Sequence, residues 1–323
     1  MIPSAVLRAA RRGFGLPHGS VRLLSTRFGK VCLAHRSHHT SLTQLRLVRE
    51  HAGTATRLHA EMVWLRHLHA RHGLSVPAPF GWRDGALVSP TLLDDDGTAW
   101  RAIRCRWVPG AHLDRGLRAR HFAAAGSLLA SMHDANRDAP AGVTAARPEW
   151  WIPRLYELAT TLRDVVHDVA PPPPGVSAAL VTGLRETSTA LARAFDTLAR
   201  GSAHAGLIHT DSHWRNMRFT TARIGIVDFE DFATGRFMLD IACLWGKVEN
   251  RHGSARMLDA ILSGYDAVRT LPPAHRRDLQ VMLAFRRLDY AGWVLSWPRI
   301  DHQPWGPAFL AGTPQYIESM LSR

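Results

Sequence analysis

Three side chains whose oxygen atoms could bind a metal ion occur within a short stretch of the sequence, residues 211–228. Asp211 follows the apolar pair Leu207-Ile208, and Asn216 comes five residues later. Two short apolar runs, residues 217–219 and 224–227, predict a hairpin that presents Asn216 and Asp228 at one edge. Amide and carboxylate oxygens suit a hard cation such as Mg2+, which takes few protein ligands and completes its shell with water and substrate phosphates.

A further carboxylate lies where an apolar residue is expected. Residues 57–72 have helical periodicity, and Glu61 falls on the apolar face between Leu58 and Leu65. Burying an unpaired charge costs several kcal/mol. We therefore expect a partner from a neighbouring strand, with Arg46 as the best candidate; alternatively, Glu61 reaches water at the edge of the face.

Two histidine groups have spacings that also occur in metal sites. His67, His69 and His72 lie on the predicted helix, but they follow an exposed, arginine-rich pattern without cysteine or acidic partners nearby, which argues against zinc. His209 and His213 flank Asp211, and the Asn216 and Asp228 that follow favour phosphate chemistry over a histidine metal cluster.

The motif His209-x-Asp211-x4-Asn216 followed by Asp228-Phe-Glu resembles the aminoglycoside phosphotransferase and choline kinase-like family, relatives of protein kinases. Four further segments fit the same family: Leu45-Arg-Leu47, Ala60-Glu-x2-Trp64-Leu65, Val76-Pro-Ala-Pro79 and Arg104–Gly110. The resemblance thus extends over nearly the whole chain.

The resemblance implies an α+β, protein-kinase-like bilobal fold with a small antiparallel β-sheet N-lobe and a larger, mostly helical C-lobe. The expected bounds are 1–106 for the nucleotide-binding lobe, 107–112 for the hinge and 113–323 for the C-lobe, which carries the catalytic loop and acceptor site.

The resemblance also implies the cofactors ATP and Mg2+ and a role for each residue. Asp211 is the implied catalytic base, and the implied metal ligands are Asn216 and Asp228. The implied nucleotide-binding residues are Arg46 paired with Glu61, Lys30, and Arg106, Trp107 and Val108 of the inter-lobe segment. Arg46 stands where kinases usually carry lysine, and its planar guanidinium positions phosphate differently from an ammonium. Asp240 is expected to brace the catalytic loop through backbone hydrogen bonds.

The chain departs from the family at the expected glycine-rich phosphate loop. Residues Ser25–Lys30 (STRFGK) contain a single glycine, and Lys30 is the candidate for supplying charge there instead. Whether this segment replaces the loop is left open by the sequence, as is the choice between ATP and GTP.

The elements that must position these residues change in type along the chain. Strand-like runs at 21–24, 30–34, 44–48 and 102–108 surround the helix at 57–72. Later helices are expected at about 118–135, 150–168, 176–200, 237–250, 254–269 and 274–295, with a tetraproline spacer at 171–174.

Composition excludes several classes of protein. The chain has 323 residues, 46% of them hydrophobic, and carries a net charge of +13. Residues 1–60 hold ten Lys or Arg and one acid, but these are dispersed arginines without the aromatic interleaving of a nucleic-acid surface. With no membrane-spanning run, no secretory signal and no paired cysteines, we expect a cytoplasmic protein without nucleic-acid or membrane partners.

The acceptor is the least determined part of the prediction. Residues 285–309 are rich in aromatics and resemble the C-terminal segment of bacterial stress-response kinases, which act on protein Ser/Thr. The basic chain argues against a polycationic acceptor. The main expectation is a kinase of a small hydroxylated metabolite or antibiotic; the alternatives are a protein Ser/Thr kinase and a nucleotide-binding pseudokinase.

Overall fold

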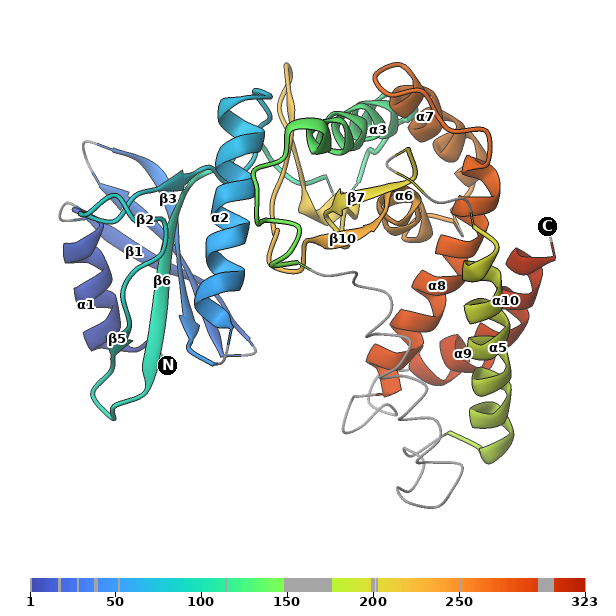
Figure 1. Ribbon diagram of the computed structural model, residues 1–323, viewed down its shortest axis with the longest axis horizontal. Coiled ribbons are helices and arrows are strands. Elements are labelled where there is room, and N and C mark those ends of the chain that lie inside the picture. Colours follow the sequence, from blue (N-terminus) through green and yellow to red (C-terminus); the bar gives the residue numbers. More distant parts are fainter. Residues whose placement is uncertain are drawn as a thin grey trace. The chain divides into compact units, whose positions relative to one another are not determined.

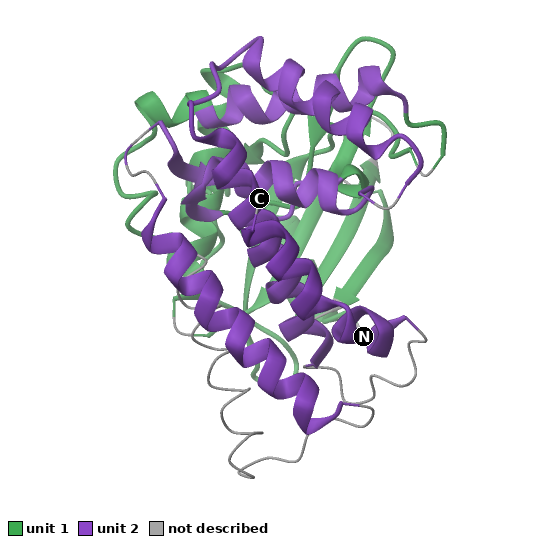
Figure 2. Cartoon of the chain, turned by 90° about the vertical axis from the view of Figure 1, so that its right-hand side faces the viewer, with its two compact units in different colours: residues 1–117, 134–147, 214–232 green, residues 118–133, 148–213, 233–323 purple. Residues whose placement is uncertain are grey.

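The computed structural model describes residues 2–16, 19–27, 29–37, 40–51, 53–113, 115–147, 176–198, 201, 203–249, 251–295 and 305–322. The chain forms two compact units, each built from separate stretches of sequence (Figure 2). The first unit contains residues 1–117, 134–147 and 214–232, and the second contains 118–133, 148–213 and 233–323. No helix among the described residues is long and apolar enough to cross a membrane.

An antiparallel sheet forms the centre of the first unit (Figure 1). Its strands are β1 (Ser20–Arg27), β2 (Lys30–Ser37), β3 (Thr40–Arg49), β4 (Pro79–Phe80), β5 (Leu92–Leu93) and β6 (Ala99–Arg106). The order is β1-β2-β3-β6-β4, with β5 also paired to β6. In the segment Ser25–Lys30, strand β1 ends at Arg27 and β2 begins at Lys30, and these two residues pair; Gly29 has a φ of 71°.

The two faces of β3 meet different helices because side chains alternate along a strand. Leu45 and Leu47 belong to a buried cluster with residues of helix α1 (Ser4–Gly13). Arg46, between them, instead contacts Glu61 of helix α2 (Thr54–Ala70). The two helices therefore cover opposite faces of the sheet, as Figure 1 shows.

A second hairpin of the first unit consists of β8 (Met217–Phe219) and β9 (Ile224–Ile226), preceded by the short helix η2 (Trp214–Asn216). Ala111 and Phe219 exchange backbone hydrogen bonds of 3.1 and 2.8 Å. Gly110 has a φ of 111°, and a Cβ there would lie 2.7 Å from the Phe219 carbonyl oxygen. This close approach requires glycine and fixes the hairpin against the segment that follows β6.

The second unit is mostly helical (Figure 1). Helix α3 (Ala119–Asp134) is followed by the short helix η1 (Ala135–Asp138), and the chain passes from the second unit to the first at residue 134. In the second unit, a short sheet pairs β7 (Ala205–Ile208) with β10 (Ala233–Arg236). The remaining helices are α5 (Ala178–Asp196), α6 (Phe237–Gly246), α7 (Ser254–Asp266), α8 (His275–Leu295), α9 (Gly306–Ala311) and α10 (Thr313–Leu321).

These elements confirm most of the expected helices and strands, including the hairpin that follows Asn216. The expected helix at 150–168 and the proline spacer at 171–174 lie outside the described residues. Helices α1, α9 and α10 are not anticipated from the sequence. The expected lobe bounds of 1–106, 107–112 and 113–323 remain a prediction. The two compact units of the structure are each assembled from several stretches of the chain.

Candidate active site

The predicted pair of Arg46 and Glu61 is present in the first unit. Arg46 Nη2 lies 2.5 Å from Glu61 Oε2, and both side chains are less than a tenth exposed. Burial alone would lower the pKa of Arg46, but attraction to the Glu61 carboxylate raises it above its usual value. The guanidinium of Arg46 therefore stays charged, and Glu61, which is 3% exposed, does not reach water at the edge of the helix.

Glu230, which the sequence analysis did not single out, joins this group of charges. Its Oε2 atom lies 2.8 Å from Lys30 Nζ and 3.9 Å from Arg46 Nη1. Both predicted phosphate-binding cations thus have the same carboxylate neighbour. The motif Asp228-Phe-Glu contains this residue, but its contact with β2 and β3 depends on tertiary packing.

The two predicted metal ligands lie at the same end of the β8–β9 hairpin. Val227 N donates to the Asn216 carbonyl oxygen at 2.9 Å, so Asp228 follows directly on the residue paired with Asn216. Asp228 is exposed and has a φ of 72°, a left-handed conformation that a residue other than glycine adopts at a cost. An amide and an exposed carboxylate at one edge fit the donor preference of Mg2+.

The inter-lobe residues named from the sequence have different environments. Val108 is buried, and Gly225 of β9 packs closely against it, because a Cβ at Gly225 would lie 2.6 Å from Val108 Cγ1. Arg106 is exposed and lies over the Phe80 ring at 5.8 Å, while Trp107 is half-buried. A role in nucleotide binding remains a proposal for Arg106, Trp107 and Val108.

Asp211 belongs to the second unit, in the loop after β7. Its Oδ1 atom accepts a hydrogen bond from Arg286 Nη2 at 2.9 Å, and its Oδ2 atom lies 3.4 Å from His213 Nε2. Arg286 also binds Asp289 at 2.9 Å. Burial would lower the pKa of Arg286, but the acidic groups around it raise it above its usual value. A permanently charged guanidinium therefore orients one oxygen of Asp211.

Asp240 braces this loop, as predicted. It is fully buried and accepts hydrogen bonds from the backbone N–H groups of His209 at 2.9 Å and Thr210 at 2.8 Å. His133 is also fully buried and lies between Tyr265 OH at 2.9 Å and Asp240 Oδ2 at 3.0 Å. The brace holds Thr210 at a φ of 71°, directly before Asp211.

A cavity of about 320 Å³ opens next to this loop in the second unit, and Arg286 forms part of its wall. Aromatic and basic side chains dominate the lining, with one acid among them: Lys247, Glu249, Arg286, Arg287, Tyr290, Trp305, Phe309 and Tyr316. Of the C-terminal aromatics considered from the sequence, Phe285 is instead buried in the core, and Trp297 lies outside the described residues.

The polar residues of the cavity are held in place by contacts with its aromatics. Tyr316 OH donates to Glu249 Oε2 at 2.6 Å. The Arg287 guanidinium lies 3.7 Å from the centre of the Phe309 ring, and Lys247 Nζ lies 3.9 Å from that of Tyr290. Burial raises the pKa of Glu249. The lining thus combines several cations with flat apolar surfaces.

The predicted site residues divide between the two units. Lys30, Arg46, Glu61, Asn216 and Asp228 lie in the first unit, and Asp211 lies in the second. Arg286 and Glu230 are the main residues that sequence reasoning missed. Arg286 is 75 residues from Asp211, in the segment 285–309 that the sequence analysis considered only for its aromatic residues, so its contact with Asp211 becomes visible only in the fold.

The small antiparallel sheet with its buried Arg–Glu pair and the mainly helical unit with its Asp-containing loop define an α+β, protein-kinase-like fold. Residues 37–278 match the model of the Phosphotransferase enzyme family. The chain belongs to this family, which confirms the resemblance drawn from the motifs.

Similar proteins include two homoserine kinases. That of Granulibacter bethesdensis is 28% identical over 232 residues, which cover 70% of this chain and 66% of the relative. That of Gluconacetobacter diazotrophicus is 33% identical over 218 residues, covering 66% of this chain and 62% of the relative. The chain thus matches slightly less than two thirds of the length of these relatives.

Two solved structures share the fold at low sequence identity. The amicoumacin kinase hAmiN, in complex with AMP-PNP, Ca2+ and Ami, has a TM-score of 0.79 and 19% identity, with 98% of this chain and 94% of that chain covered. A microcompartment-associated aminopropanol kinase has a TM-score of 0.78 and 22% identity, with 99% of both chains covered.

Proposed function

We propose that the protein transfers the γ-phosphate of Mg-ATP to a hydroxyl group of a small acceptor bound in the cavity of the second unit. One observation carries the proposal: Arg286 lines this cavity and also donates a hydrogen bond of 2.9 Å to Asp211. An acceptor in the cavity would thus lie beside the residue proposed as the catalytic base.

In the proposed reaction, the acceptor hydroxyl oxygen forms a bond to the γ-phosphorus while the bond from that phosphorus to the bridging oxygen of ADP breaks. Asp211 orients the hydroxyl and takes its proton. Arg46 and Lys30 bind phosphate oxygens, and Glu61 holds Arg46 in place. Asn216 and Asp228 would hold Mg2+, which neutralises charge on the phosphates when bound.

The cavity favours a compact acceptor with a negatively charged group. Lys247, Arg286 and Arg287 offer positive charge, whereas Glu249 is the one acid among the described residues that line it. Such a lining attracts a carboxylate and repels a polycation, which argues against aminoglycosides. A hydroxy amino acid fits this chemistry, because Glu249 could also receive its ammonium group. The homoserine kinases similar to this chain support this class.

The test is ADP release from Mg-ATP by the purified full chain with L-homoserine, 1-amino-2-propanol or kanamycin, with each product identified by mass. We expect turnover with L-homoserine in preference to kanamycin. Preference for kanamycin would overturn the assigned acceptor class. Phosphate appearing on protein from a host lysate, with none of the small molecules labelled, would favour a protein kinase.

Variants of the cavity provide a second test. Lys247→Met and Arg287→Gln should raise the KM for a carboxylated acceptor and leave the KM for ATP unchanged. Arg256→Met, which removes an exposed charge on α7, is the matched control. An unchanged acceptor KM in both cavity variants would contradict the assignment of this cavity as the acceptor site.

A further inference from the structure

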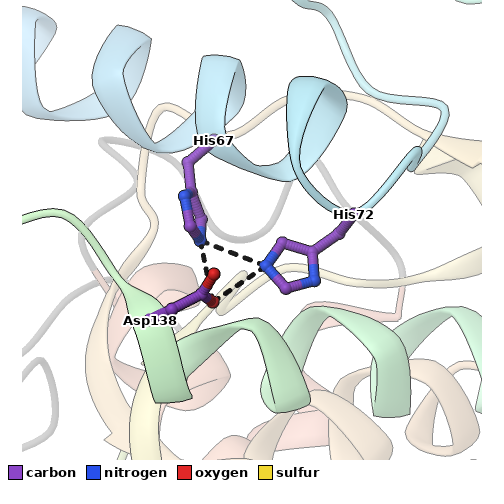
Figure 3. A group of neighbouring side chains, drawn as sticks. All are labelled: His67, His72 and Asp138. Carbon is purple, nitrogen blue, oxygen red and sulfur yellow. Dashed lines mark hydrogen bonds and ion pairs between the residues drawn. The ribbon is translucent and has the colours of Figure 1, made fainter.

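Three side chains of the first unit point toward a common centre at the end of α2 (Figure 3). His72 Nε2 lies 2.9 Å from Asp138 Oδ1 and 3.2 Å from His67 Nε2. His67 Nε2 lies 3.3 Å from the same Asp138 oxygen. The cluster shares no residue with the groups assigned to phosphate transfer.

The spacing of these three atoms matches the edges of a metal coordination tetrahedron. Zinc binds imidazole nitrogen and carboxylate oxygen at about 2.0–2.2 Å, which places neighbouring ligand atoms about 3.3 Å apart. Both Nε2 atoms face the same Asp138 oxygen, and His67 Nε2 also lies 3.4 Å from the Ala135 carbonyl oxygen. If both imidazoles donate to Asp138, two N–H groups face each other across the 3.2 Å between His67 and His72. A central cation receives all three lone pairs.

The ligands differ in burial in a way that suits a site with one open position. His67 is 8% exposed, and its ring stacks on Trp64 with the ring centroids 5.4 Å apart. The side chains of His72 and Asp138 are 26% and 43% exposed, so water can complete the coordination. Arg71 lies 3.9 Å from Asp138 Oδ2, the oxygen that does not face the histidines.

The structure changes which residues form the cluster. The sequence places His67, His69 and His72 near one another without an acid. In the structure, His69 Nδ1 contacts the backbone oxygen of Leu74 at 3.1 Å, and Asp138 of η1, 66 residues from His72, takes its place beside the other two histidines.

We propose that His67, His72 and Asp138 bind a divalent transition-metal ion, with Zn2+ as the first candidate, through His67 Nε2, His72 Nε2 and Asp138 Oδ1. The ion links the end of α2 to the segment 134–147. Arg147 of that segment already donates to the Arg57 carbonyl oxygen of α2 at 3.1 Å. The metal thus fixes the second end of the helix that carries Glu61. The site is independent of the proposed function.

The test uses the full chain without a histidine tag, treated with a chelator and titrated with ZnCl2 in excess Mg2+, which occupies any hard-cation site. We expect one Zn2+ per chain by calorimetry and elemental analysis. His72→Ala and Asp138→Asn remove partly exposed ligands, so both variants should fold, as circular dichroism would verify. Each should weaken binding by roughly 100-fold or more.

The matched control is His69→Ala, which removes a neighbouring histidine outside the cluster and should bind Zn2+ like the wild type. Zinc should raise the thermal midpoint of the wild type and of His69→Ala, but not of the two ligand variants. Co2+ should give the visible absorption of a tetrahedral site in the wild type and in His69→Ala, but not in the two ligand variants. Equal Zn2+ binding by wild type, His72→Ala and Asp138→Asn would overturn the proposal, as would no binding by the wild type.

Discussion

Arg286 donates a hydrogen bond of 2.9 Å to Asp211 from 75 residues further along the chain. The contact fixes one carboxylate oxygen of Asp211. The other oxygen lies 3.4 Å from His213, whose pKa is lowered by burial. The orientation of the proposed base is thus set by α8, a helix that lies outside the motif from His209 to Glu230.

Asp211→Asn should lower kcat by about 100-fold to 10,000-fold, because an amide cannot accept the hydroxyl proton. Binding of ATP should be retained, as measured by fluorescence with a nucleotide analogue. Asp289→Asn is the matched control, since Asp289 binds the same arginine. Unchanged transfer in Asp211→Asn would remove this residue from the assigned role.

Arg46→Met should destabilise the fold by about 3–5 kcal/mol, because it leaves the Glu61 carboxylate buried without its closest partner. Arg147, whose Nη2 lies 3.9 Å from Glu61, should keep the loss toward the lower value. The double variant Arg46→Met/Glu61→Leu should lose less than the sum of the single variants. Urea denaturation of all four proteins measures the coupling, and strictly additive losses would argue against it.

Glu230→Gln should lower the KM for ATP about fivefold, the equivalent of about 1 kcal/mol for a partly exposed ion pair. The variant removes the negative charge beside Lys30 and Arg46, and both cations then attract phosphate more strongly. Initial rates at varied ATP measure the effect, with Asp231→Asn as the control for a lost charge nearby. A raised KM would show that Glu230 itself helps to bind the nucleotide.

The stability of the protein should fall as the pH drops below about 6.5, partly because of His133. Burial lowers the pKa of His133, so in this window the unfolded chain binds a proton that the folded chain excludes. His133→Gln should reduce the fall in thermal midpoint between about pH 7.5 and about pH 5.5. The exposed His59, changed to Gln, is the control. An equal fall in His133→Gln and wild type would exclude this histidine as a source of the acid sensitivity.

Local patterns predicted those parts of the site that depend on neighbouring residues. The apolar face of α2 required a partner for Glu61, and strand alternation indicated Arg46. The short apolar runs around the hairpin placed Asn216 and Asp228 at one edge. Each of these predictions follows from periodicity within a single element and needs no knowledge of distant packing.

Contacts between distant segments could not be predicted in this way. Arg286 on α8 looks like any arginine on an amphipathic helix until it lies beside Asp211. Asp138 joins His72 from 66 residues away, through a short helix with no pattern of its own. Helix α1 was missed, although Val6 and Ala10 lie on one face of its sequence and are completely buried in the cluster that includes Leu45 and Leu47 of β3.

The division of the first unit has a consequence for its biosynthesis. Its sheet is complete by residue 106, but the hairpin that packs on Val108 and Ala111 belongs to residues 214–232. At translation rates of about 5 to 20 residues per second, roughly 6 to 23 seconds pass between the synthesis of residues 117 and 232. During this interval the nascent chain exposes the apolar surface that the hairpin later covers, and a chaperone that binds emerging chains would meet it there.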